Sequence, residues 1–192
     1  MKLSTFYPFL VGTVISGVVA QLSDQLVTDL NNYLDVTTDL EFNFVHLPVD
    51  FDTQSQVSAI TNGLDRLTRA INAFNTTATD LAANSPTLAP ADAAQIIDTI
   101  QIIAGNTTGM VSALVTKTYF CQNFGIFIDA AMVPAKETIF LALNSIGKIT
   151  PDPLDTLLVS SRTSLTNSYF KVLVYRNLFH DFDSPCIPWG TA

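Results

Sequence analysis

The sequence predicts an all-α protein: an antiparallel bundle of about five long helices, whose interior is either a packed core or a central apolar cavity. Two observations lead to this fold. Apolar residues recur at intervals of three and four along five separate segments, which places them on one face of a helix in each segment. Proline, glycine and polar clusters separate these segments, and no useful length of sequence alternates between apolar and polar residues as a strand would.

The first two helices follow from long stripes of helical spacing. The first stripe continues until Pro48, because proline lacks the amide hydrogen that a helix interior needs. The second ends before the segment NSPTLAPAD, whose two prolines predict a loop. The stripes are Leu26, Leu30, Tyr33, Thr37, Leu40, Phe44 and Leu47 in the first helix, and Val57, Ile60, Leu64, Leu67, Ile71, Phe74, Ala78 and Leu81 in the second.

The third helix is expected to start at Pro90, because proline fits the first position of a helix. The segment AGNTTG is a weak point at which this helix is expected to bend or split. The fourth helix spans about 126–146 and contains Pro134, which predicts a kink, and the fifth begins near Pro153. The stripes are Ile96, Ile100, Ile103, Thr107, Met110 and Leu114 in the third helix, and Leu154, Leu158, Leu165, Tyr169, Val172 and Leu173 in the fifth.

The N-terminus has the pattern of a secretory signal peptide. Lys2 precedes an apolar run from Phe6 to Val19, and Val18-Val19-Ala20 is a small-residue cleavage site. A membrane anchor is the alternative, but the run is short for a hydrocarbon layer of ~30 Å. The expected organisation is a signal peptide over 1–20, a helical bundle domain over 21–179 and a C-terminal tail over 180–192.

Composition and charge favour an extracellular location and argue against some partners. Cleavage after Ala20 would remove one lysine and no acid, so the formal net charge would change from −8 to −9. An acidic chain argues against nucleic acid and against anionic lipid headgroups as partners. No segment after the signal peptide is expected to cross a membrane, and no hydrophobic tail signals a lipid anchor.

Two kinds of modification are expected outside the cell. Cys121 and Cys186 are the two cysteines, and in an oxidising compartment they most simply form one disulfide, with two separate buried thiols as the alternative. Asn75 and Asn106 each begin an Asn-x-Thr sequence that can accept an N-linked glycan. The chain is therefore expected to be a secreted glycoprotein.

No constellation of catalytic residues is recognisable. The two histidines, His46 and His180, lack a Gly-x-Ser-x-Gly nucleophile motif to act with, and no phosphate loop or dinucleotide fingerprint occurs. Neither the histidines nor the cysteine pair have metal-ligand spacing. We therefore expect no enzymatic activity, no cofactor and no metal. A small secreted hydrolase stays an alternative, because catalytic residues can meet in space without a sequence motif.

The apolar content points to hydrophobic binding. The chain holds 13 phenylalanines and only 14% charged residues. A packed core explains most of these side chains, but a bundle with bulky aromatic residues can also enclose or present a surface for an aliphatic ligand. The residues expected to line such a site on the last four helices are Leu67, Ile71, Phe74, Ile100, Ile103, Leu114, Phe124, Ile139, Phe140, Leu143 and Tyr169.

The pattern of these segments resembles a known family. The segments TDLNNYLDVTTDL, AITNGLDRLTRAINAFNTTATDLAAN and GMVSALVTKTYFCQNFGIFIDAAMVPAKETIFLALNSI are similar to the fungal hydrophobic surface-binding protein A family, which includes cell-wall galactomannoproteins. The resemblance covers approximately Leu22 to Asn177. It contains no diagnostic motif that would transfer a single residue role. The cysteine pair and the tail HDFDSPCIPWGTA are departures from the family pattern.

The resemblance implies a non-enzymatic helical protein, secreted or attached to the cell wall, that binds a fatty acid, another lipid or a hydrophobic surface. It also implies a secreted esterase as a partner. The alternative within the same family is a structural or antigenic cell-wall mannoprotein whose core is full and which binds no ligand. A cavity inside the bundle would favour the first role, and a filled core the second.

Overall fold

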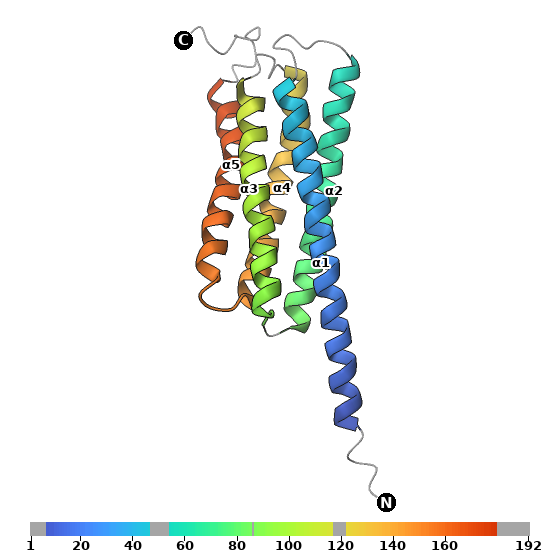
Figure 1. Ribbon diagram of the computed structural model, residues 1–192. Helices are drawn as coiled ribbons and strands as arrows, with labels where there is room; N and C mark the ends of the chain where they lie inside the picture. Colours follow the sequence, from blue (N-terminus) through green and yellow to red (C-terminus); the bar gives the residue numbers. More distant parts are fainter. Residues whose placement is uncertain (1–6, 47–53, 86, 117–121, 180–192) are drawn as a thin grey trace, which may run out of the picture.

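The computed structural model describes residues 7–46, 54–85, 87–116 and 122–179, with side chains at 17–46, 58–85, 87–113 and 131–171. Every element in these ranges is an α-helix, which confirms the predicted all-α fold. The helices are long and run roughly side by side (Figure 1). They are α1 (Tyr7–His46), α2 (Gln54–Asn84), α3 (Pro90–Thr116), α4 (Gln122–Ile149) and α5 (Asp155–Phe179).

The helices form a closed ring. Each helix packs against two others, and the order round the ring is α1, α2, α4, α5, α3 and back to α1. Helices that follow one another in the chain run in opposite directions (Figure 1). Because the order in space differs from the order in the chain, α1 and α3, α3 and α5, and α2 and α4 are parallel neighbours.

A ring of five leaves more space at its centre than a ring of four. With neighbouring axes ~10 Å apart, five axes lie ~8.5 Å from the centre of the ring and four lie ~7 Å from it. No described backbone crosses the middle, so side chains must fill it. Large side chains at the inward positions are therefore a requirement of this fold, and the predicted stripes supply them.

The stripes account for which face of each helix is buried. The described stripe residues of α1, from Leu26 to Phe44, are almost all at most 3% exposed, and the same holds for those of α2 from Ile60 to Leu81. Polar Thr37 fits into the first stripe because its hydroxyl donates to the Tyr33 and Leu34 carbonyl oxygens. The exposed faces between the stripes carry most of the charged residues; Asp29 of α1 is buried and accepts hydrogen bonds from Gln25 and Thr77.

Helix α3 is continuous through AGNTTG, where a bend or split was expected. Packing overrides the low helix propensity of the glycines here. Gly109 lies against the Glu41 side chain of α1, and a Cβ atom at this position would collide with it. Gly63 of α2 has a similar close contact with Leu40. These two glycines allow α2 and α3 to approach α1 closely.

The loop between α2 and α3 is joined to the end of α4. The Leu88 amide donates a hydrogen bond of 2.7 Å to the Ile149 carbonyl oxygen. The Leu88 side chain is buried in the core as well. This contact satisfies a C-terminal carbonyl of α4 and closes one end of the bundle.

Helix α1 extends beyond the other four at its N-terminal end (Figure 1). Among its described side chains, which begin at residue 17, the first fully buried one is Leu26, whereas Val18 and Ala20 are exposed and Val19 only touches the edge of the core. No helix in the described part of the chain has both the length and the apolar character to cross a membrane. The tail 180–192 and both cysteines lie outside the described residues, so the domain limits and the disulfide stay predictions.

Candidate functional site

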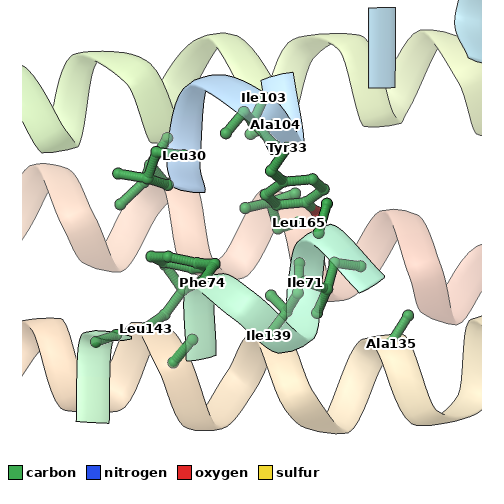
Figure 2. Close-up of a cluster of buried hydrophobic side chains, with 14 of the residues drawn as sticks. Leu30, Tyr33, Ile71, Phe74, Ile103, Ala104, Ala135, Ile139, Leu143 and Leu165 are labelled. Carbon is green, nitrogen blue, oxygen red and sulfur yellow. The ribbon is translucent and has the colours of Figure 1, made fainter. Parts of the chain in front are cut away.

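The centre of the ring is an apolar cluster to which all five helices contribute (Figure 2). Eight of the predicted lining residues belong to this core, and each is at most 1% exposed. They come from four helices that the sequence separates widely, and the ring brings them together. These residues are Leu67, Ile71, Phe74, Ile100, Ile103, Ile139, Leu143 and Tyr169.

Three predicted lining residues are not placed in this cluster. The Phe140 side chain is 45% exposed on the outside of α4. The reason is helical geometry: Ile139 and Leu143 point into the core, and Phe140 is turned by about 100° from Ile139. Leu114 and Phe124 have side chains outside the described residues.

Helix α1 also contributes to the centre, whereas the lining residues predicted from the sequence belong to the other four helices only. Leu30 and Tyr33 lie among the labelled core side chains (Figure 2), together with Leu165 of α5. The apolar stripes contain these residues, since Leu30 and Tyr33 belong to the first stripe and Leu165 to the fifth. The stripes do not indicate that α1 is a full member of the ring.

A pair of tyrosines forms a polar contact within this apolar centre. The hydroxyl oxygens of Tyr33 and Tyr169 lie 2.9 Å apart and share a hydrogen bond. The Tyr33 ring also stacks on Phe74, with the ring centroids 6.4 Å apart. The pair joins α1 to α5, two helices that are not neighbours in the ring, so the contact crosses the interior.

Burial keeps both phenols protonated. Loss of solvation raises the pKa of Tyr169 to about 12, and the hydrogen bond with Tyr33 opposes this rise. Burial, and then the neighbouring Tyr169, raise the pKa of Tyr33 well above its ordinary value. The centre is therefore uncharged at physiological pH, and its hydroxyl groups are neutral donors and acceptors.

The sequence predicted either a packed core or a central cavity, and in this structure side chains fill the centre of the ring. A side chain beside a space large enough for water would itself be accessible to a water-sized sphere. Phe74, Ile103 and Tyr169 are each at most 1% exposed, so no such space adjoins them. A ligand that enters the centre must therefore displace side chains or move helices apart.

The two candidate glycan sites differ in their surroundings. Asn75 is half-buried, and Thr77 of the same sequence is buried and donates a 2.6 Å hydrogen bond to Asp29 of α1. At the second site, Asn106 Nδ2 donates a 2.8 Å hydrogen bond to the Thr38 hydroxyl. The Asn106 amide therefore lies at a helix–helix contact, whereas Asn75 lines an open groove between α2, α4 and α5. Glycosylation at either position stays a prediction.

His46, the histidine within the described residues, has a contact inside its own helix. Its ring nitrogen Nδ1 lies 2.7 Å from the Phe42 carbonyl oxygen, one turn earlier in α1, and the His46 and Phe42 rings pack together. His180 lies outside the described residues. Within the described part of the chain, no three His, Cys, Asp or Glu side chains are close enough together to hold a metal ion. What the centre offers is apolar enclosure with three neutral hydroxyl groups: the pair of Tyr33 and Tyr169 and the buried hydroxyl of Thr107, for which the described residues give no partner.

Comparison with known proteins gives a match in fold. The sequence matches no protein-family model, and no curated protein is similar to it in sequence. Among solved structures, AFMP4P in complex with palmitic acid has a TM-score of 0.68 and 14% identity, covering 80% of this chain and 98% of that one. The chain shares this fold.

A second solved structure has the same relation to the chain. Ligand binding domain 1 of the Penicillium marneffei MP1 protein, complexed with arachidonic acids, has a TM-score of 0.66 and 13% identity. It covers 77% of this chain and 93% of that one. At this level of identity the likeness establishes a related fold, and membership of the hydrophobic surface-binding family stays a prediction.

Proposed function

We propose that this protein binds a long-chain fatty acid, or a lipid with a similar chain, between its five helices, and that it does so without catalysing a reaction. The observation that carries the proposal is the closed ring of five helices with an uncharged, almost wholly apolar centre. The proposal is supported by the fold that the chain shares with two proteins solved in complex with palmitic and arachidonic acids.

Binding requires the bundle to open. Each helix is held by two neighbours, so a modest outward movement of one helix enlarges the centre without breaking the whole ring. The acyl chain then replaces side-chain contacts, and each methylene group removed from water contributes ~0.8 kcal/mol. The ligand stabilises the expanded conformation because it binds that conformation better than the packed one.

A titration of fatty-acid-free protein tests this function. We expect palmitic acid to bind saturably with a fixed stoichiometry, and affinity to fall about fourfold for each methylene removed from the chain. Lauric acid and methyl palmitate serve as matched probes for chain length and for the charged headgroup. Binding that never saturates, or that is equal for palmitic and lauric acid, would contradict binding between the helices.

A structural cell-wall mannoprotein with a filled core is the second candidate. It is favoured by the packing of Phe74, Ile103 and Tyr169, which leaves no water-sized space beside them. In that case fatty acid would neither bind saturably nor raise the unfolding temperature. The same titration therefore separates the two candidates.

Secretion to the outside of the cell or to the cell wall completes the proposal. It is supported by the signal-peptide pattern of residues 1–20 and by the position of Leu26, the first fully buried side chain, beyond the cleavage site. Removal of 1–20 would therefore take no fully buried described side chain from the core. Glycans at Asn75 and Asn106 and a disulfide between Cys121 and Cys186 belong to the same proposal.

A further inference from the structure

The outer face of α4 and α5 is unusually apolar. Ten large apolar side chains are exposed in the described part of the chain, and six of them belong to these two helices. Four of the six, which we call the α4–α5 face, are connected by grooves and ring contacts: Phe140, Leu141, Val159 and Phe170. Single exposed apolar residues need no explanation, but a connected set marks an interaction surface.

Two open grooves run along this face and meet at Leu141. One, of about 500 Å³, is lined by Lys136, Phe140, Leu141 and Thr166 together with one acidic side chain. The other, of about 720 Å³, extends from Leu141 to Val159 and is bordered by Asn75 and Thr79 of α2. A glycan on Asn75 would stand at the edge of this second groove, away from Phe140 and Phe170, which the second groove does not include. The spacing on each helix explains why the face is continuous, because residues three or four apart in a helix lie on the same side.

Basic side chains lie over the aromatic rings of this face. Lys136 Nζ is 4.6 Å from the centre of the Phe170 ring, and Arg162 Cζ is 5.8 Å from the centre of the Phe140 ring. Arg162 also donates a 2.7 Å hydrogen bond to Asn144 Oδ1. Apolar rings with cations at their edges suit the boundary between lipid chains and phosphate headgroups, where Lys and Arg extend their charges towards the headgroups.

The charges of the chain are divided between two halves of the bundle. Residues 7–116 contain eleven acidic and two basic residues, whereas residues 122–179 contain four acidic and five basic residues. The formal net charge of −8 therefore arises from α1–α3 and their loops. The acidic net charge of the whole chain does not exclude anionic headgroups at the α4–α5 face, because residues 122–179 are not acidic.

We propose that the α4–α5 face docks on the surface of a phospholipid bilayer that contains anionic headgroups. Phe140, Leu141 and Phe170 would enter the interfacial layer, while Lys136, Arg162 and the exposed Lys148 of the second groove contact phosphate groups.

The two grooves are lined by three basic side chains, Lys136, Lys148 and Arg162, and by two acidic ones, Glu137 and Asp155. Five further acidic residues belong to α1, which packs against neither α4 nor α5. At physiological salt, charges separated by more than ~8 Å are largely screened.

This surface is independent of the proposed binding between the helices, because none of its four apolar residues belongs to the buried core. Flotation of the full chain with vesicles tests it. The probe is phosphatidylcholine with about a quarter phosphatidylglycerol. We expect Phe140→Ser with Phe170→Ser to lower the partition coefficient roughly tenfold or more.

The bundle provides a matched control on its acidic side. Phe42 of α1 and Ile102 of α3 are 62% and 54% exposed. Phe42→Ser with Ile102→Ser removes a similar exposed apolar area and should leave the partition coefficient unchanged within about twofold. The apolar N-terminal segment is common to all variants, so only differences between them are informative.

A second pair of variants tests the charges. Lys136→Gln with Lys148→Gln should weaken binding on the order of tenfold, and Arg66→Gln with Arg69→Gln on α2 should not. Wild-type binding should also fall as salt increases. The proposal is overturned if the wild type does not float with the vesicles, if both aromatic pairs have equal effects, or if the α4–α5 face holds two copies of the chain together in solution.

Discussion

Replacing Phe74 with alanine should lower the free energy of unfolding by about 3–5 kcal/mol. Phe74 lies at the centre of the ring, is 1% exposed and stacks on Tyr33. Each surrounding helix is held by two neighbours, so the helices can close only part of the space left by the ring, and the remaining cavity adds to the loss of stability. Denaturant unfolding of the two proteins measures the loss as a shift in the transition midpoint.

The same variant links stability to function. If fatty acid binds between the helices, saturating palmitic acid should raise the unfolding midpoint of Phe74→Ala by more than that of the wild type, because the chain fills the new cavity. Phe42→Ala, on the outside of α1, is the control and should change stability by at most ~0.5 kcal/mol. Equal losses for Phe74→Ala and Phe42→Ala would contradict the packed centre described above.

Alkaline pH should destabilise the bundle through the tyrosine pair. The folded-state pKa of Tyr169 is about 12, and that of Tyr33 is also raised, while both are ~10 in the unfolded chain. A group whose pKa is raised by folding makes its full contribution to the free energy of unfolding at pH values below the unfolded pKa. This contribution is lost as pH rises from about 10 through 12. The loss due to Tyr169 alone is on the order of 2 kcal/mol by pH 12.

The double variant Tyr33→Phe with Tyr169→Phe tests this dependence. Because both partners of the hydrogen bond are removed, its stability at pH 7 should stay close to that of the wild type. Its unfolding temperature should then fall less than that of the wild type between pH 9 and 12. Absorbance at alkaline pH should show two late-titrating phenols in the wild type only. Equal pH profiles would mean that the pair is hydrated in solution.

The helices could be predicted from the sequence because their signals are local. Apolar stripes at helical spacing located all five, and Pro48 and Pro90 marked boundaries close to the observed ones. Helix α3 is the exception, since Gly105 and Gly109 suggested a break. The reason it continues is the contact of Gly109 with Glu41, which lies 68 residues earlier in the chain and has no local signature.

The candidate site could be predicted only in part, because it depends on how the helices are ordered in space. The stripes found most of the central residues, yet they could not tell that α1 and α5 meet across the interior through Tyr33 and Tyr169. Phe140 was assigned to the interior on its residue type, while its position beside Ile139 turns it outward. The net charge of the whole chain likewise does not indicate that α4 and α5 are not acidic.

The most direct test of lipid binding is the intact mass of the protein isolated from the organism that makes it, measured under native and then denaturing conditions. The proposed function predicts a mass increment that is present in the native spectrum, absent after denaturation and recovered as long-chain fatty acid. Identical native and denatured masses, from protein that unfolds cooperatively and does not take up added palmitic acid, would contradict it and identify the centre as a permanently filled core.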